Sequence, residues 1–149
     1  MKKTIYIHVF LVPIAYIILC SCNTSQKVNF HPVKGGTNVK MEIPKGAKLT
    51  RTASANEDEF IYRYADSPLV YVSTFSGGSV NYDVIRGQGT YYDLFNAEKS
   101  QDTLTLSGID STGLYWKNIT IGEVHIGYKY VPKYKKILFD SALKTMRKY

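Results

Sequence analysis

The feature that most limits how this chain can fold is the position of its two cysteines. Cys20 and Cys22 both stand at the end of an apolar run, Ile5–Leu19, which follows Lys2 and Lys3. A basic start, an apolar stretch and small residues at its end form the layout of a secretory signal peptide. We expect this segment to be removed. The remaining body then has no thiol beyond Cys22, which excludes a disulfide framework, a thiolate zinc site and a cysteine nucleophile.

The tetrapeptide Leu19-Cys20-Ser21-Cys22 resembles the lipobox of bacterial lipoproteins, in which Leu stands three residues before the modified cysteine and a small residue stands one before it. Cys20 occupies a position where Ala or Ser is more usual. The resemblance implies a cut before Cys22, diacylglycerol on its thiol and an acyl chain such as palmitate on the new amino group. Asn23 stands where Asp is typical of inner-membrane retention, so the outer membrane is favoured.

Three other interpretations of the segment stay open. An uncleaved membrane anchor needs about 20 apolar residues, whereas this run has about 15 and includes His8 and Pro13. An ordinary secretory signal would use Cys20-Ser21-Cys22 as a loose small-x-small cleavage site. A buried helix of a cytosolic domain would not be expected beside flanking lysines and the polar residues that follow.

Length and charge limit the class of the mature chain. Removing residues 1–21 from the 149 leaves 128 residues, a length typical of a single domain. The formal charge of +7 falls to +5 without Lys2 and Lys3. Seven basic residues, against the single acid Asp140, lie near the C-terminus: Lys129, Lys133, Lys135, Lys136, Lys144, Arg147 and Lys148. In an exported protein this tail suits anionic lipid headgroups or acidic polymers better than nucleic acid, and a solvated helix face is the alternative.

The residue pattern predicts an α+β fold, an antiparallel sheet of five to seven strands with a C-terminal helix packed on one face. Residues 22–37 are polar and predict a lipid-anchored flexible tether, and residues 38–149 predict a single α+β domain. Alternating or β-branched runs predict strands at residues 38–43, 47–52, 60–64, 69–75, 103–109, 114–121 and 124–131. Residues 80–102 fit either a strand or a short helix.

The last segment predicts a helix that begins at Pro132 and runs to the C-terminus. Its apolar residues repeat at three and four positions and predict a buried stripe made of Leu138, Phe139, Ala142, Leu143 and Met146.

Two short stretches are similar to small PsbP-like α+β domains. They are Ile43-Pro44-Lys45-Gly46 after a strand, and Lys136-Ile137-Leu138-Phe139-Asp140 with Ala142-Leu143 in the closing helix. The resemblance implies an adaptor or assembly module rather than an enzyme.

Residues able to carry chemistry are few. His31 lies in the expected tether, and His125 alternates with Val124 and Ile126, so we expect it to face solvent. Neither Ser76–Ser79 nor Gly87–Gly89 has the spacing or context of a nucleophile elbow or a dinucleotide site. We expect no enzyme activity, no cofactor and no metal. Carboxylates that converge from distant positions stay open as an alternative.

The candidate ligand-binding residues are four aromatics beside polar loops: Tyr91, Tyr92, Tyr115 and Trp116. A ring on an outer sheet face would suit a glycan or peptide, but alternation lets only one of Tyr115 and Trp116 face outward. Packing in the core is the alternative for these rings.

The sequence therefore favours a lipid-anchored cell-envelope protein that acts as a non-catalytic interaction or assembly module. Its expected partners are the membrane, through the acyl anchor at Cys22, and an unidentified envelope protein or glycan, with no nucleic acid. Two alternatives are a glycan- or peptide-binding lipoprotein and an immunity-type inhibitor of an envelope-acting toxin.

Overall fold

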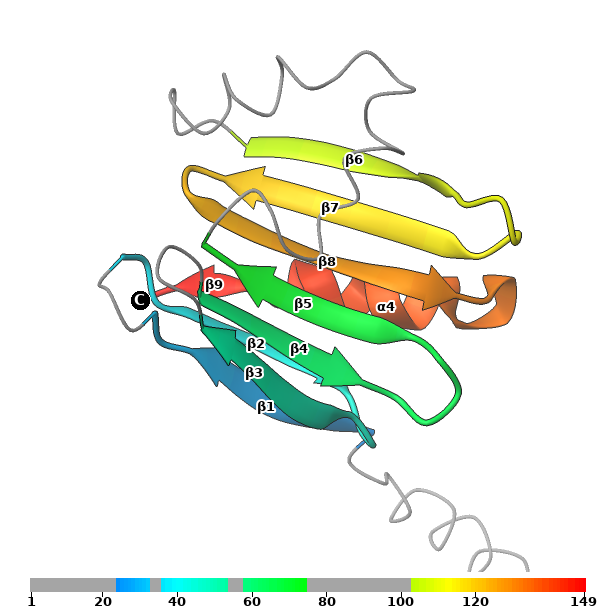
Figure 1. Cartoon of the computed structure of the whole chain (residues 1–149), viewed down its shortest axis with the longest axis horizontal. Helices are drawn as coiled ribbons and strands as arrows, with labels where there is room; N and C mark the ends of the chain where they lie inside the picture. Colours follow the sequence, from blue (N-terminus) through cyan, green and yellow to red (C-terminus); the bar gives the residue numbers. More distant parts are fainter. Residues whose placement is uncertain (1–23, 33–35, 54–57, 75–102) are drawn as a thin grey trace, which may run out of the picture.

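The computed structural model describes residues 24–32, 36–53, 58–74 and 103–149. In this part of the chain the strands form two antiparallel sheets, and one α-helix follows the last long strand (Figure 1). The elements are β1 (Ser25–Phe30), β2 (Val39–Pro44), β3 (Lys48–Ala53), β4 (Asp58–Arg63), β5 (Leu69–Ser73), β6 (Thr103–Ile109), β7 (Tyr115–Ile121), β8 (Val124–Val131), the 3-10 helix η1 (Lys133–Lys135), α4 (Lys136–Lys144) and β9 (Arg147–Lys148). The expected α+β class, with a helix on one face of an antiparallel sheet, is confirmed.

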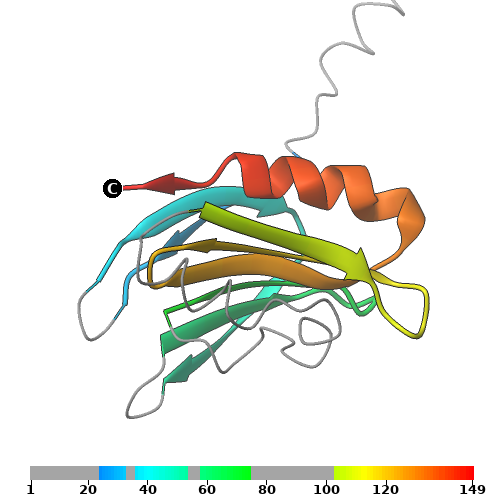
Figure 2. The same ribbon diagram turned by 90° about the horizontal axis from the view of Figure 1, so that it is seen from above.

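The elements form two layers. A six-stranded sheet in the order β3-β4-β5-β8-β7-β6 makes one layer. The three-stranded sheet, in the order β1-β2-β9, makes the other together with α4, and Figure 2 shows α4 beside β2 on the same side of the larger sheet. β9 pairs Arg147 with Lys40, so the end of the chain is tied to β2.

The main core fills the space between these layers. The inward faces of β1 and β2 meet those of β4, β5 and β8, and α4 closes one side. Phe30 and Phe60 pack edge to face across the interface, with ring centroids 4.9 Å apart. The buried members are Val28, Phe30, Val39, Met41, Ile43, Phe60, Tyr62, Val70, Val72, Val124, Ile126, Tyr128, Val131, Phe139 and Leu143.

Turn chemistry explains where the later strands reverse. The Asp110 carboxylate accepts hydrogen bonds from the backbone amides of Thr112 at 2.8 Å and Leu114 at 3.0 Å. Gly113 there has a φ of +82°. At the β7–β8 turn Gly122 has a φ of +57°, which the first central position of a type II′ turn requires.

A bulge near the end of β8 redirects the chain toward the helix. The pairing of β7 with β8 shifts by one residue after Lys117 and Tyr128, and the extra residue lies on β8. Tyr130, in this stretch, has a φ of +59°, a left-handed conformation that is rare for an aromatic residue. Pro132 follows directly, and η1 and α4 begin after it.

The tether expected from the sequence is wrong for Ser25–Phe30, which forms β1. This strand pairs with β2 along its whole length, and its Val28 and Phe30 side chains are only 7% and 1% exposed. The folded domain therefore includes residues well before position 38. The polar composition of the segment hid the alternation of Lys27 to Phe30, which is the pattern of a half-buried strand.

The expected extent of the C-terminal helix is also wrong. α4 ends at Lys144, and the chain continues into β9 instead of remaining helical. Phe139, Ala142 and Leu143 are buried as predicted, but Leu138 is 47% exposed and is not part of the core. The expected strand or helix at residues 80–102 lies outside the described residues.

Candidate functional site

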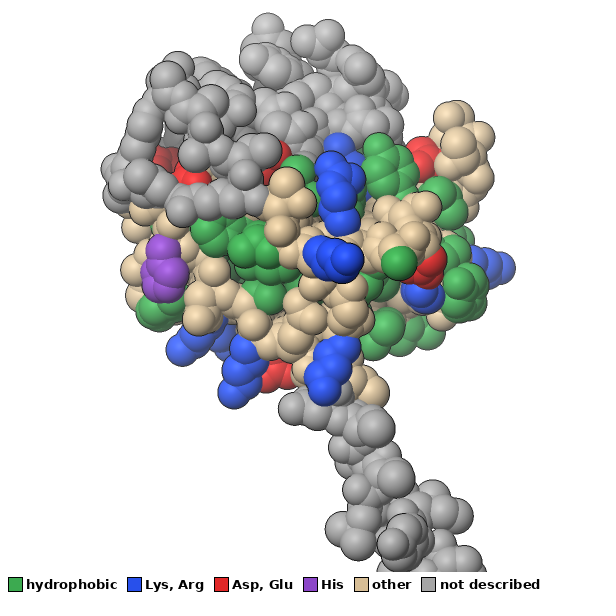
Figure 3. All heavy atoms as spheres, turned by 60° about the horizontal axis from the view of Figure 1, so that its bottom comes forward, with side chains coloured by type: hydrophobic (Ala, Val, Ile, Leu, Met, Phe, Trp, Pro, Cys, Tyr) green, Lys and Arg blue, Asp and Glu red, His purple; other side chains and the backbone are tan. Residues whose placement is uncertain are grey.

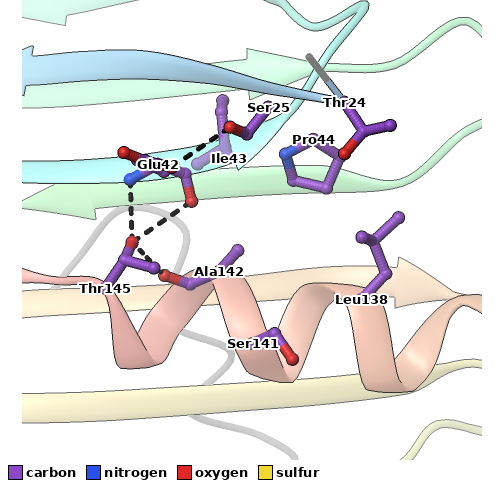
Figure 4. Close-up of a pocket in the computed structure, with 9 residues that line it drawn as sticks. All are labelled: Thr24, Ser25, Glu42, Ile43, Pro44, Leu138, Ser141, Ala142 and Thr145. Carbon is purple, nitrogen blue, oxygen red and sulfur yellow. Dashed lines mark hydrogen bonds between the residues drawn. The ribbon is translucent and has the colours of Figure 1, made fainter. Parts of the chain in front are cut away.

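A groove follows the junction between β2 and α4 (Figure 4). Its first part has a volume of about 130 Å³, and we call it the apolar groove because carbon atoms form most of its surface. It is lined by Thr24, Ser25, Glu42, Ile43, Pro44, Leu138, Ser141, Ala142 and Thr145. Figure 4 shows Leu138 on the helix opposite Thr24 and Pro44 on the strand side.

Thr145 joins the helix to β2 at one end of the apolar groove. Its hydroxyl accepts a hydrogen bond from the Glu42 amide at 2.8 Å and donates to the Ala142 carbonyl at 2.7 Å. The hydroxyl thus satisfies a backbone donor of the strand and a carbonyl of the last helical turn at once. This bridge fixes the spacing between the two walls of the groove.

Thr24 is held in place where β1 begins. Its carbonyl accepts a hydrogen bond from the Lys45 amide at 3.0 Å. The next residue, Ser25, pairs with Pro44, and its hydroxyl donates to the Glu42 carboxylate at 3.1 Å. Backbone and side-chain bonds to β2 therefore set the point at which the chain enters the described domain.

A second, larger part of the groove lies on the outer side of β1 and β2 and has a volume of about 500 Å³. We call it the basic groove, because four of its lining residues are cationic and Glu42 is its one acid. The lining residues are Lys27, Asn29, Lys40, Met41, Glu42, Lys144, Thr145 and Arg147. Glu42 and Thr145 also line the apolar groove, so the two parts adjoin. Figure 3 shows several lysine and arginine side chains on the face of the domain that it draws.

Large apolar side chains are exposed beside the apolar groove. Tyr134 is 80% exposed, Ile137 81% and Leu138 47%. The spacing of three and four residues puts them on one side of η1 and the first turn of α4. This side differs from the buried stripe that begins at Phe139, so the segment carries two apolar faces and the described domain covers one of them.

Asp140 fixes the opposite side of the helix to the sheet. Its carboxylate accepts hydrogen bonds from Lys117 at 3.2 Å and Tyr128 at 3.0 Å, both on the six-stranded sheet, and from Lys136 at 2.5 Å. Burial acts to raise the pKa of Asp140. The hydrogen bonds from Lys136, Lys117 and Tyr128 outweigh it, and the pKa is lowered.

The structure describes two of the four aromatics that the sequence proposed as ligand-binding, Tyr115 and Trp116. Tyr91 and Tyr92 lie outside the described residues. Tyr115 is partly buried against the main core, whereas Trp116 lies on the other face and is 6% exposed. The Trp116 ring lies over Gly108, where an added Cβ would come within 2.9 Å of it. Trp116 is therefore buried, and the partly buried Tyr115 lies on the opposite face of β7, so the two rings do not share one surface.

The expected position of His125 is wrong. It does face away from Val124 and Ile126, but it is fully buried instead of facing solvent. Its Nδ1 lies 3.0 Å from the Thr120 hydroxyl. Desolvation lowers the pKa of His125 to about 4, so the imidazole is neutral at physiological pH. Strand alternation identified its face, but the sequence held no signal that this face is covered.

A buried hydrogen-bond chain leads to His125 across the six-stranded sheet. Tyr71 donates its hydroxyl proton to Asn118 Oδ1 at 2.8 Å, and Asn118 donates to the Thr120 hydroxyl at 2.9 Å. The Thr120 hydroxyl, 3.0 Å from Nδ1 of His125, connects the imidazole to this chain. The chain satisfies polar groups that would otherwise be costly to bury.

Neither a metal cluster nor a membrane-crossing helix is found in the described part of the chain. No three His, Cys, Asp or Glu residues there are grouped so that they could hold a metal ion. No helix there is long and apolar enough to span a bilayer. His31 contacts the C-terminal residue: its Nε2 lies 3.0 Å from the Tyr149 hydroxyl, and its Nδ1 lies 3.3 Å from Asn38 Oδ1.

Comparison of the chain with protein-family models, curated proteins and solved structures returned no match. The functional inference therefore rests on the groove, its charges and its position relative to Cys22.

Sequence reasoning missed this groove almost entirely. It identified the basic C-terminal residues Lys144 and Arg147, but it assigned Lys27 to the tether and Leu138 to the core. The alternation around Val28 was the one available signal for β1. No local pattern could reveal that α4 would pack beside β2, because more than 90 positions of the chain separate the helix from this strand.

Proposed function

We propose that the protein is a lipid-anchored protein of the cell envelope, held in the membrane through Cys22, and that its domain is a non-catalytic interaction or assembly module. The lipobox-like tetrapeptide that ends at Cys22 supports the anchor, and Asn23 supports the outer membrane as its location.

The short distance along the chain between Cys22 and the folded domain carries the proposal. Thr24 is hydrogen-bonded to Lys45, and β1 begins at Ser25. The two residue steps from Cys22 to Thr24 span at most about 7 Å when extended. A lipid on Cys22 therefore holds the domain directly at the membrane surface.

The composition of the groove supports binding in preference to catalysis. Among the residues that line its two parts there is no histidine, and Glu42 is the one acid. The Glu42 carboxylate accepts a hydrogen bond from Ser25. The buried imidazole of His125, with its pKa of about 4, is a weak base at neutral pH.

Intact-mass spectrometry of the protein purified from membranes tests the anchor. We expect a chain that begins at Cys22 and carries added acyl mass, and we expect Cys22→Ala to abolish both the acyl mass and membrane retention. A Cys22→Ala protein that is processed and fractionates normally would refute the anchor.

Density-gradient separation of the two membranes tests the location. We expect the natural chain in the outer-membrane fraction and Asn23→Asp in the inner-membrane fraction, because that substitution supplies the residue typical of retention. Thr50→Asp, which adds the same charge at an exposed position of β3, is the matched control. Identical fractionation of all three proteins would refute the role of Asn23.

A pull-down from solubilised membranes, with the lipidated protein as bait, tests the interaction module. We expect a reproducible protein partner. A bait that retains no protein beyond the background of the resin without bait would count against the module.

A further inference from the structure

We propose that the layer formed by α4 and the three-stranded sheet rests on an anionic bilayer surface, with Tyr134, Ile137 and Leu138 inserted at the lipid interface. The proposal deepens the proposed function and rests on lipid attachment at Cys22. It assigns the groove between β2 and α4 to the membrane, and not to a soluble ligand.

The first support is the position of the attachment point. Thr24 lines the apolar groove opposite Leu138 (Figure 4). Cys22 lies at most about 7 Å from it along the chain. The headgroup region of one leaflet is about 5–7.5 Å thick, given a bilayer of about 40–45 Å around a hydrocarbon core of about 30 Å. Acyl chains on Cys22 therefore bring Thr24, and the groove wall beside it, to the level of the headgroups.

The second support is the uncovered apolar face of the helix. Tyr134, Ile137 and Leu138 are exposed at 80%, 81% and 47%, although each is large and apolar in its body. Exposed apolar patches of this kind mark interaction surfaces. Leu138 faces Thr24 across the groove, so this patch borders the attachment point. Acyl chains on Cys22, two residues before Thr24, are therefore the partner nearest to this patch.

The third support is charge. Lys27, Lys40, Lys144 and Arg147 line the basic groove that adjoins the apolar one. Glu42 is the one acid among the lining residues, so four cations stand against one carboxylate. A helix with Lys on one side and Tyr, Ile and Leu on another is suited to lie in the plane of a membrane interface, and its basic residues favour anionic lipid.

This placement also defines the face that points away from the membrane. The outer side of the six-stranded sheet is opposite the α4 layer (Figure 2). Thr50 pairs with Ile61, which belongs to the cluster on that outer side, and Lys48 pairs with Arg63 on the same side. Thr50, Lys48 and Arg63 are exposed and serve as controls for any measurement on the membrane-facing side.

Fluorescence quenching by acrylamide, which reaches a label only from water, tests the placement on the full lipidated protein. The Cys22 thiol is blocked by lipid and Cys20 leaves with the signal, so a cysteine introduced at Ile137 or Thr50 is the one free thiol and can carry an environment-sensitive label. On phosphatidylglycerol–phosphatidylethanolamine vesicles we expect acrylamide to quench the label of Ile137→Cys several-fold less than that of Thr50→Cys. Equal quenching of the two labels would overturn the proposal.

A charge reversal tests the electrostatic part. In the Ile137→Cys background, we expect Lys27→Glu with Lys144→Glu to expose the label to acrylamide on these vesicles, and Lys48→Glu with Arg63→Glu to leave it shielded. On phosphatidylcholine vesicles we expect weaker shielding than on the anionic ones. If the shielding of the label depended on neither the substitutions nor the lipid composition, the role of the basic groove would be refuted.

Mass spectrometry of the same samples separates the two levels of the proposal. Acyl mass on Cys22 with an unshielded Ile137 label refutes the docking surface and leaves the anchor intact. A chain without acyl mass refutes the anchor, and the docking surface with it.

Discussion

His125 is the residue at which burial changes the chemistry most. Its imidazole is fully buried beside Thr120, and desolvation lowers its pKa from 6.5 to about 4. Above pH 6.5 it is neutral in both the folded and the unfolded chain. Between pH 6.5 and pH 4 the unfolded chain binds the proton more readily, so stability falls as the pH falls, by up to roughly 3 kcal/mol. Below pH 4 the imidazole is protonated in both states and adds no further loss.

We therefore predict that His125→Gln flattens the dependence of unfolding free energy on pH in this window, whatever its effect at pH 7. Urea unfolding at several pH values between 4 and 7 measures this slope. His31→Gln changes an exposed histidine and is the control. A slope in His125→Gln as steep as in the natural chain would show that other groups cause the acid sensitivity.

Asp140 is the residue that ties α4 to the six-stranded sheet, through Lys117 and Tyr128. We predict that Asp140→Asn lowers the free energy of unfolding at pH 7 by about 1–3 kcal/mol, because the cationic and hydroxyl donors lose a charged acceptor. The pKa of Asp140 is lowered in the folded chain, so its contribution is present above the ordinary value of 3.8 and is lost as the pH falls through the folded pKa. The difference between the two proteins in urea unfolding should therefore shrink at acidic pH. A constant difference would mean that the substitution perturbs packing instead.

At the scale of elements, α4 has two apolar faces with opposite roles. We predict that Leu143→Ala costs about 2–5 kcal/mol of unfolding free energy, because Leu143 is 3% exposed in the main core. Leu138→Ala, at a residue that is 47% exposed, should cost less than about 1 kcal/mol. Thermal or urea unfolding of the two variants measures the contrast. Similar losses would show that Leu138 also contributes to the core.

The elements that the sequence predicted well are those whose signals are local. The hairpin of β4 and β5 and the meander of β6, β7 and β8 have alternating or β-branched runs and turn residues such as Gly113 and Gly122. The end of α4 could not be read in this way. Its position depends on hydrogen bonds between Thr145 and Glu42, which are 103 residues apart in the chain.

At the scale of the whole molecule, the arrangement of layers and the groove between them were beyond sequence reasoning. A stripe of apolar residues shows that a helix must be buried, but it does not show which strands lie beside it. The sequence predicts Leu138 in the core because its spacing fits the buried stripe equally well. The same limit applies to His125, whose face was predicted correctly while the cover over that face was not.

The whole domain depends on β1, because this strand is a structural part of the layer that covers the core. Phe30 is 1% exposed and packs against Phe60, and β1 pairs along the full length of β2. We predict that Phe30→Ala lowers the free energy of unfolding by about 3–5 kcal/mol, whereas Asn29→Ala, on the exposed side of the same strand, stays within about 0.5 kcal/mol of the natural chain. Urea unfolding followed by circular dichroism measures both.

If β1 were instead the flexible tether that its composition suggests, neither variant would move the unfolding midpoint, and a chain that begins at residue 38 would unfold as cooperatively as one that begins at Cys22. We expect the shorter chain to lose its cooperative transition, because Val39, Met41 and Ile43 would lie on an edge strand without the neighbour that completes their sheet.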